Sequence, residues 1–225
     1  SSREVELLAG DGGREGGAGR RLVPIAWDAT RGAVRLIDQT LLPTELKYID
    51  IRSFDDMCEA IAMLRVRGAP AIGVAGALGI YLGLVERAPV SAAGVFEALD
   101  ELCPRMIGVR PTAVNLSWAV NRVRRAVERA AGAAGAGGAV GGAGGAKPPE
   151  LLEAALREAM AIAEEDAAAC RRIGEYGAQF VPDGGRVLTH CNAGALATAG
   201  WGTALAALYV AQEQGKRFRV WADET

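Results

Sequence analysis

The sequence predicts an α/β protein, in which a mixed N-terminal domain of a small β-sheet plus helices is followed by the start of a second domain with a parallel sheet. Three observations predict this class. Short apolar runs separated by a turn between residues 24 and 51 are typical of strands. Apolar residues recur at helical spacing over most of 54–178. Residues 186–222 then follow the order strand, turn, helix, strand, which is one βαβ unit.

Composition argues against several classes of partner. The 225 residues carry a net charge of −2 and no basic stripe, so the chain lacks the electrostatic footprint of a nucleic-acid-binding protein. We expect no membrane-spanning segment, because no uninterrupted apolar stretch reaches the roughly 18 residues required. The four cysteines have no paired spacing and the chain has one histidine, so neither a disulfide framework nor a metal site is expected. Small, discrete ligands are favoured.

Short strands open the ordered part of the chain. Residues 1–21 are rich in Gly, Ser, Arg and Glu, which predicts a disordered N-terminal segment. An N-terminal α+β domain is expected over 22–148. It begins with a hairpin, from strands at 24–27 and 33–37, and continues with a strand at 46–51.

Helices follow these strands. Ser53 suits an N-cap, and the apolar spacing after it predicts a helix that ends near Arg65. Pro70 suits the first turn of a second helix, which runs through Gly79. Its three glycines are tolerable only where another segment or a ligand comes close. Further helices are expected at 91–106 and 112–130.

A Gly/Ala-rich insert occupies 130–146, where Val140 is the single exception. Such low complexity predicts a flexible loop between helices. Beyond it, apolar residues at helical spacing within 149–182 predict a long connecting helix.

The last part of the chain, 183–225, has the pattern of an incomplete Rossmann-like domain. It predicts strands at 186–189 and 218–222 around a helix at about 194–214. Ligands of such sheets bind beyond the carboxyl ends of the strands, where Cys191 lies. There Cys191 would face a helix N-terminus, whose dipole and unpaired N–H groups favour a thiolate or a bound anion. The alternative is an inert buried thiol.

Two arginines and the single histidine complete the candidate site. Arg67 and Arg110 each precede a predicted helix, and planar guanidinium groups beside helix N-termini are typical of phosphate sites. The alternative is that each arginine is merely solvated. His190 would point to the opposite face of the strand from Cys191, so a protease-like Cys–His pair is not expected. We assign His190 to positioning the turn.

Longer motifs carry a resemblance to a known family. They are Arg-Gly-Ala-Pro-Ala-Ile-Gly at 67–73, Arg-Pro-Thr-Ala-Val-Asn-Leu at 110–116 and Thr-His-Cys-Asn-Ala-Gly-Ala-Leu-Ala-Thr at 189–198. Leu-Ile-Asp-Gln-Thr-Leu-Leu-Pro at 36–43 and Asp-Glu-Thr at 223–225 match in the same order. The chain resembles the 5-methylthioribose-1-phosphate isomerase family, within the superfamily of the alpha, beta and delta subunits of translation initiation factor 2B. The resemblance covers about 22–225, apart from the insert.

The resemblance implies an aldose–ketose isomerase that converts 5-methylthioribose 1-phosphate to 5-methylthioribulose 1-phosphate in methionine salvage, without a metal or nucleotide cofactor. It implies that Arg67, Gly68, Ala69 and Arg110 bind the sugar phosphate. Cys191 would stabilise the transition state or move a proton. A homodimer in the cytoplasm is implied as well, and eukaryotic relatives are also nuclear.

In the family, the proton-donating aspartate lies in a later strand, past the Asp-Glu-Thr segment in which this chain stops. Asp223 is therefore not assigned that role. We expect the 225 residues to be a C-terminally truncated fragment that is inactive by itself.

Two other functions stay open. One is a non-catalytic regulatory subunit of the translation initiation factor 2B type, which would use the same fold for subunit assembly. The other is a ribose-1,5-bisphosphate isomerase, a related class that does not share the Ala-Pro-Ala-Ile-Gly and Cys-Asn-Ala-Gly-Ala-Leu-Ala-Thr strings in this full form. Loss of turnover on Cys191→Ser, with folding intact, would favour the isomerase over the regulatory subunit.

Overall fold

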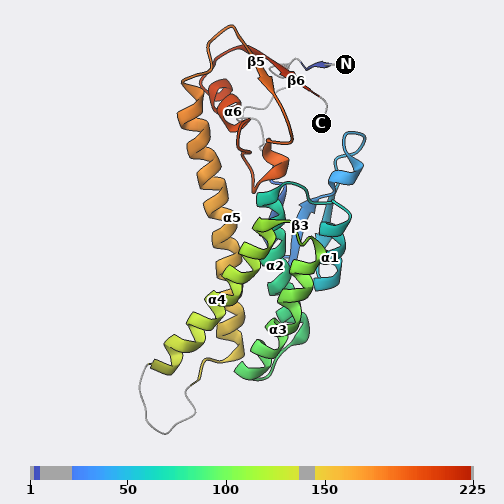
Figure 1. Ribbon diagram of the computed structural model, residues 1–225, viewed down its shortest axis with the longest axis vertical. Helices are drawn as coiled ribbons and strands as arrows, with labels where there is room; N and C mark the ends of the chain where they lie inside the picture. The colour runs from blue at the N-terminus through green and yellow to red at the C-terminus, as the bar shows by residue number, and fades with distance from the viewer. Residues whose placement is uncertain (1–2, 6–21, 137–144, 224–225) are drawn as a thin grey trace.

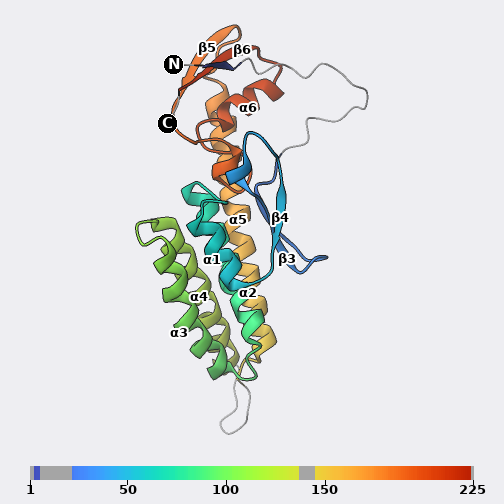
Figure 2. The same cartoon turned by 90° about the vertical axis from the view of Figure 1, so that its right-hand side faces the viewer.

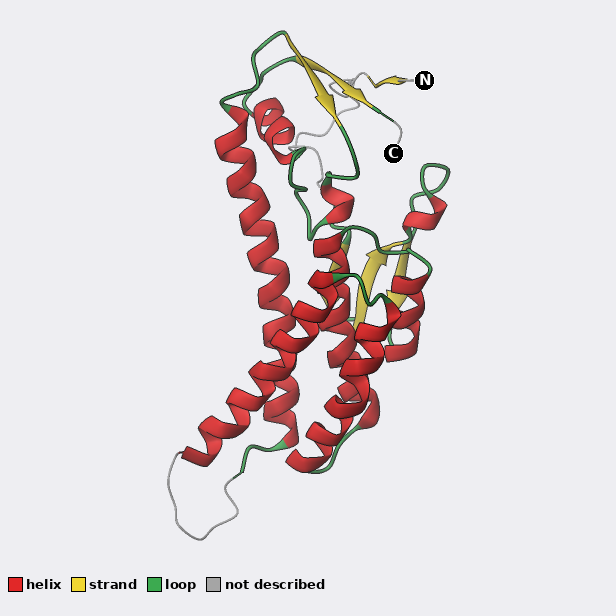
Figure 3. Ribbon diagram, viewed as in Figure 1, coloured by secondary structure: helices red, strands yellow, loops and turns green. Residues whose placement is uncertain are grey.

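Helices form most of the structure, and small sheets lie on their side and at their end (Figures 1 and 3). The computed structural model describes residues 3–5, 22–136 and 145–223. The predicted class is confirmed, because a mixed sheet-and-helix region precedes a unit with parallel strands.

The first sheet is antiparallel, in the order β2-β3-β4. Its strands are β2 (Ile25–Asp28), β3 (Ala33–Ile37) and β4 (Tyr48–Ile51), so the hairpin and the third strand are both confirmed. Asp28 closes the hairpin turn, because its Oδ1 accepts hydrogen bonds from the backbone N–H groups of Thr30 and Arg31. Side chains of β3 alternate little in burial and lie almost entirely in the core.

Four helices follow, as the apolar spacing predicts. They are α1 (Phe54–Ala62), α2 (Ala69–Arg87), α3 (Ala92–Val109) and α4 (Val114–Ala136). The Ser53 N-cap is confirmed, since its Oγ accepts a hydrogen bond from the Asp56 N–H at 3.1 Å. Figure 2 shows β3 and β4 on one side of α1 and α2, with α3 and α4 on the other.

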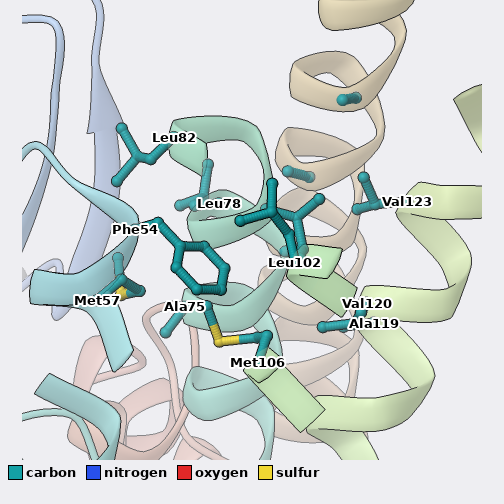
Figure 4. Close-up of a cluster of buried hydrophobic side chains, with 14 of the residues drawn as sticks. Phe54, Met57, Ala75, Leu78, Leu82, Leu102, Met106, Ala119, Val120 and Val123 are labelled. Atoms are coloured by element: carbon teal, nitrogen blue, oxygen red, sulfur yellow. The ribbon is translucent and has the colours of Figure 1, made fainter. Parts of the chain in front are cut away.

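Helix α2 is the centre of the larger core, and its glycines allow the neighbouring helices to approach. A Cβ on Gly76 would lie 2.3 Å from the Leu116 Cδ1 of α4. A Cβ on Gly79 would lie 2.6 Å from the Met106 Cε of α3. Figure 4 shows Phe54 among the side chains packed over this helix. The predicted close packing of the glycine-rich helix is therefore confirmed.

Among the described helices, α2 is long and apolar enough to cross a bilayer by length and composition. The expectation that no stretch reaches this length is therefore wrong. In the structure 72% of its apolar window is buried inside the protein, so the core packing described above accounts for the apolar character of α2.

Further boundaries differ from the sequence prediction, and α2 itself ends at Arg87 and not at Gly79. Helix α4 continues through Ala136, so the start of the insert predicted as a loop is helical, because alanine is the strongest helix former. Strand β1 (Arg3–Val5) pairs antiparallel with the last strand, within the segment predicted to be disordered. Backbone pairing stabilises this strand despite its polar composition. The rest of both predictions, at 1–2, 6–21 and 137–144, falls outside the described residues.

The second unit has parallel strands and docks on a long helix. Helix α5 (Pro148–Ala178) is the predicted connecting helix, and β5 (Gly185–Thr189) runs parallel to β6 (Phe218–Ala222). Between the strands lie a 3-10 turn, η2 (Ala195–Ala197), and helix α6 (Ala206–Glu213). The predicted βαβ unit is confirmed, but its helix begins twelve positions later than 194, at Ala206.

The contact between α5 and α6 gives a stability prediction. A Cβ on Gly174 would lie 2.8 Å from the backbone oxygen of Ala206 and 2.7 Å from Val210 Cγ2. We expect Gly174→Ala to destabilise the protein by about 1–3 kcal/mol through overpacking. Gly132→Ala is the matched control, since no atom lies within 4 Å of its Cβ position in α4. It should be stabilising by up to about 1 kcal/mol. Urea unfolding of both variants checks this, and equal midpoints would contradict it.

Candidate active site

Residues 67–69, at the start of α2, contact the second unit through the backbone of Gly68 and not through a side chain. Gly68 is the N-cap of α2, with φ +90°, and its carbonyl accepts the Ile72 N–H at 2.9 Å. A Cβ on Gly68 would lie 2.4 Å from the Cα of Ala197. Only glycine fits a contact this close, and positive φ favours it as well. The segment 67–69 is therefore in direct contact with the turn that follows Cys191.

The second arginine occupies an equivalent place before α4. Arg110 is the C-cap of α3, and its carbonyl accepts the Ala113 N–H at 2.9 Å, which turns the chain into α4. The first turns of α2 and α4 are neighbours, because a Cβ on Gly73 would lie 3.1 Å from the Asn115 carbonyl oxygen. The two arginines thus precede adjacent helix ends, where N–H groups favour an anion.

The interactions of the Arg67 and Arg110 guanidinium groups set these two arginines apart from others in the described chain. Arg67 is exposed and Arg110 is half-buried. Within the described ranges, neither guanidinium forms an ion pair or a side-chain hydrogen bond, whereas Arg65, Arg122 and Arg124 are all paired with carboxylates. These two groups are therefore free to bind a phosphate bidentately.

Cys191 follows β5 in a strained loop. Its φ is +68°, a left-handed conformation that is uncommon for a non-glycine residue. Such strain persists only where the surrounding structure imposes it, and it is frequent at functional sites. Cys191 is exposed, whereas the other three cysteines are partly or fully buried. Burial raises the pKa of the Cys58 and Cys103 thiols to about 11, so these thiols stay protonated at neutral pH.

The expected helix N-terminus beside Cys191 is absent from this part of the described chain, which corrects the sequence prediction. The backbone forms η2 and then an irregular turn before α6 begins. Thr198 Oγ1 is buried and accepts the N–H groups of Gly200 and Gly202, which competes with helical bonding. Gly202 has φ +79°, which no α-helix contains. The loop is closed by the Thr203 N–H, which donates to the Ala193 carbonyl.

His190 binds a carboxylate beyond β6. Its Nδ1 lies 2.7 Å from Asp223 Oδ2, so the pair joins the carboxyl ends of β5 and β6. This contact agrees with a role in positioning the turn. The described hydrogen bond of the His190 ring is thus made to Asp223, and none joins it to Cys191 among the described residues.

A cavity of about 220 Å³ lies between the first turns of α2 and α4 and the middle of α5. Its walls include Pro70, Asn115, Trp118, Glu165 and Asp166. Asp166 also reaches the Cys191 loop, because its Oδ2 accepts the Ala199 N–H at 2.7 Å. Burial raises the pKa of the Asp166 carboxyl, and the bond to Ala199 opposes that effect. Asp166 thus both lines the cavity beside the two helix ends and holds the loop that follows Cys191.

The structure brings together some of the predicted site residues. Gly68 contacts the loop of Cys191, while the described contacts do not join the Cys191 thiol to Arg67 or Arg110. Sequence reasoning did not assign a role to Gln39, whose Nε2 donates to the Leu196 carbonyl, or to Asp166. Gln39 lies inside the motif at 36–43, which was a usable signal. Asp166 lies in the acidic and alanine-rich middle of a long helix and gave none.

The described residues contain no group of three or more His, Cys, Asp or Glu side chains that could hold a metal ion. Among the described residues, the groups near this site include the Cys191 thiol, the guanidinium groups of Arg67 and Arg110, the carboxylates of Glu165 and Asp166, and backbone N–H groups.

Proteins of known name are similar to this chain in sequence. The 5-deoxyribose 1-phosphate isomerase of Moorella thermoacetica is 47% identical over 204 residues, which cover 91% of this chain and 54% of that protein. The methylthioribose-1-phosphate isomerase of Symbiobacterium thermophilum is 43% identical over 206 residues, which cover 92% and 54%. The chain therefore spans about half the length of the curated relatives it matches.

Solved structures are similar as well. The translation initiation factor eIF-2B, subunit delta, from A. fulgidus matches with a TM-score of 0.76 at 42% identity, covering 88% of this chain and 53% of that one. The 5-methylthioribose 1-phosphate isomerase from Pyrococcus horikoshii matches with a TM-score of 0.74 at 32% identity, covering 86% and 50%. The pattern of the initiation factor 2 subunit family matches residues 65–225, which is most of the chain. This chain therefore belongs to the initiation factor 2 subunit family.

Proposed function

We propose that this chain is part of an isomerase that converts 5-methylthioribose 1-phosphate or 5-deoxyribose 1-phosphate to the corresponding ketose 1-phosphate. One observation supports it above the others: the backbone of Gly68 lies against the turn after Cys191, so the Arg67 segment and the Cys191 loop are neighbours in the structure. The names of relatives at 43–47% identity agree with this chemistry.

In this proposal the two arginines hold the phosphate on C1. The N–H groups at the starts of α2 and α4 add donors and dipole. C1 carries the phosphate, so the sugar ring cannot open as a free hemiacetal does, and the ring oxygen must be polarised during the reaction. Cys191 would act at C1 and C2, where it moves a proton or stabilises developing charge as the two carbons exchange oxidation levels. The net reaction needs no external oxidant or reductant.

The two proposed substrates differ at C5, and both carry phosphate on C1. The direct test is turnover of each sugar phosphate by the complete gene product, meaning the longest polypeptide encoded by the reading frame that contains this chain. Proton NMR would follow the loss of the anomeric signal. Turnover of either compound supports the isomerase. Absence of turnover with both, in a folded protein, would contradict it and favour a regulatory role like that of the initiation-factor subunits.

The arginine assignment gives a separate prediction. We expect Arg67→Met and Arg110→Met each to raise KM about 10–150-fold, because each removes a charge-assisted contact of roughly 1.5–3 kcal/mol. Arg172→Met is the control, since Arg172 is an exposed arginine of α5 away from the cavity. Steady-state kinetics check this. An unchanged KM in both site variants would remove the arginines from the phosphate site.

The process and the assembly are also proposals. Relatives named methylthioribose-1-phosphate isomerase support a role in methionine salvage, and the family resemblance supports a cytoplasmic homodimer. Light scattering of the complete gene product tests the dimer, which a monomeric mass would contradict.

A further inference from the structure

Two polar side chains hold the turn after Cys191 from outside its own unit. Gln39 belongs to the 3-10 turn η1 (Gln39–Leu41) and is 8% exposed. Its Nε2 donates to the Leu196 carbonyl at 2.8 Å. Asp166 of α5 accepts the Ala199 N–H at 2.7 Å. Gly68 packs on Ala197 between these two bonds. Three elements distant in sequence therefore contact Leu196, Ala197 and Ala199, which are three of the four residues of the turn 196–199.

Gln39 is itself attached to the segment that leads to Arg67. Its backbone N–H donates to the Arg65 carbonyl at 2.9 Å. The preceding residue, Asp38, is 3% exposed and binds the Arg65 guanidinium at 2.6 Å. One residue thus connects the chain just before Arg67 with the chain just after Cys191, because its main chain binds the first and its side chain binds the second.

Partial burial of the Asp166 carboxylate costs free energy unless another group stabilises it. Its carboxylate has no ion-pair partner in the described part of the chain, and the Ala199 N–H is its described hydrogen-bond donor. Partial burial of a carboxylate is unfavourable unless it is well hydrogen-bonded. A bond from a backbone N–H to a charged acceptor is stronger than a neutral one. The bond to Ala199 is therefore the described interaction that offsets part of this cost.

We propose that Gln39 and Asp166 are positioning residues that fix the turn 196–199, and through it Cys191, relative to the Arg67 segment. This inference rests on the proposed function, in which the arginines hold the phosphate while Cys191 acts at C1 and C2. A displacement of about 1 Å between a reacting group and its substrate can cost about 10²-fold in rate. Both side chains act through the backbone and do not need to touch the substrate.

The test uses Gln39→Glu and Asp166→Ala in the complete gene product. Gln39→Glu keeps the shape but places a carboxylate against the Leu196 carbonyl. We expect each variant to lower kcat about 10–100-fold, with KM changed less than about threefold because the phosphate contacts remain. Gln39→Met is a second variant, for use if Gln39→Glu does not fold. Its side chain is uncharged and similar in size to glutamine but cannot donate the hydrogen bond to Leu196. Asp166→Asn keeps an acceptor for Ala199 and should restore most of the lost kcat.

A readout independent of activity separates this inference from the proposed function. Hydrogen exchange of the amides at 196–199 should accelerate at least about tenfold in Gln39→Glu and Asp166→Ala, which corresponds to about 1.4 kcal/mol of lost protection. Alkylation of Cys191 by iodoacetamide, followed by mass spectrometry, should change rate in the same variants.

Matched controls are Gln212→Glu on α6 and Glu164→Gln on α5, both exposed positions. They should leave exchange and kcat unchanged. Unchanged exchange at 196–199 in folded Gln39→Glu and Asp166→Ala would overturn the inference, as would faster exchange with kcat unaltered. Faster exchange in a protein that turns over neither sugar phosphate would support the contacts and overturn the proposed function instead.

Discussion

We expect Cys191→Ser to lower kcat of the complete gene product by about 10²–10⁴-fold, the usual contribution of a positioned acid–base group. A hydroxyl has nearly the shape of a thiol but a far higher pKa, so it neither exchanges a proton at neutral pH nor carries negative charge as readily. Folding should be unaffected, because Cys191 is exposed. Steady-state kinetics and circular dichroism of the purified variant check the two parts of this prediction.

Cys58→Ser is the control for loss of a thiol. Burial raises the pKa of Cys58 to about 11, so this group does not supply a thiolate at neutral pH, and turnover should be retained. Full activity of Cys191→Ser would remove Cys191 from the mechanism.

Gly68→Ala should give the largest loss of stability among single-methyl substitutions. The new Cβ would lie 2.4 Å from both the Cα and the carbonyl oxygen of Ala197, and backbone atoms cannot swing aside as a side chain does. The φ of +90° adds conformational strain. Strain and overpacking of about 1–3 kcal/mol each give a total of roughly 2–6 kcal/mol. Where the protein still folds, the Cys191 loop must move away and kcat should fall with it.

Gly32→Ala separates the effect of backbone strain from the effect of overpacking. Gly32 also has a positive φ, +57°, but no atom lies within 4 Å of its Cβ position. The free energy of unfolding of Gly32→Ala should fall only by the cost of backbone strain, about 1–2 kcal/mol. Urea unfolding of both variants measures the difference. Equal unfolding midpoints would mean that the contact between Gly68 and Ala197 yields without cost, and would contradict the rigid junction described above.

Local rules predicted most elements in this protein, because local chemistry decides them. The N-cap at Ser53 needs only a hydroxyl next to a helix start, and the structure contains that bond. The glycines of α2 signalled close packing correctly, since glycine inside a helix needs a tertiary reason. The same logic failed at 194–204. There the apolar and small residues suggested a helix, but the Thr198 hydroxyl takes the N–H groups of Gly200 and Gly202 and the backbone turns instead.

The sequence by itself determined the fold class, the order of the elements and the candidate residues Cys191, Arg67 and Arg110, because periodicity, capping and motif spacing are local properties of a chain. Tertiary structure alone decided that Gly68 meets Ala197 and that Gln39 and Asp166 hold the turn between them. The bond from Gln39 to Leu196 joins residues 157 positions apart. A contact of that kind depends on how all the intervening helices pack, and no local pattern contains that information.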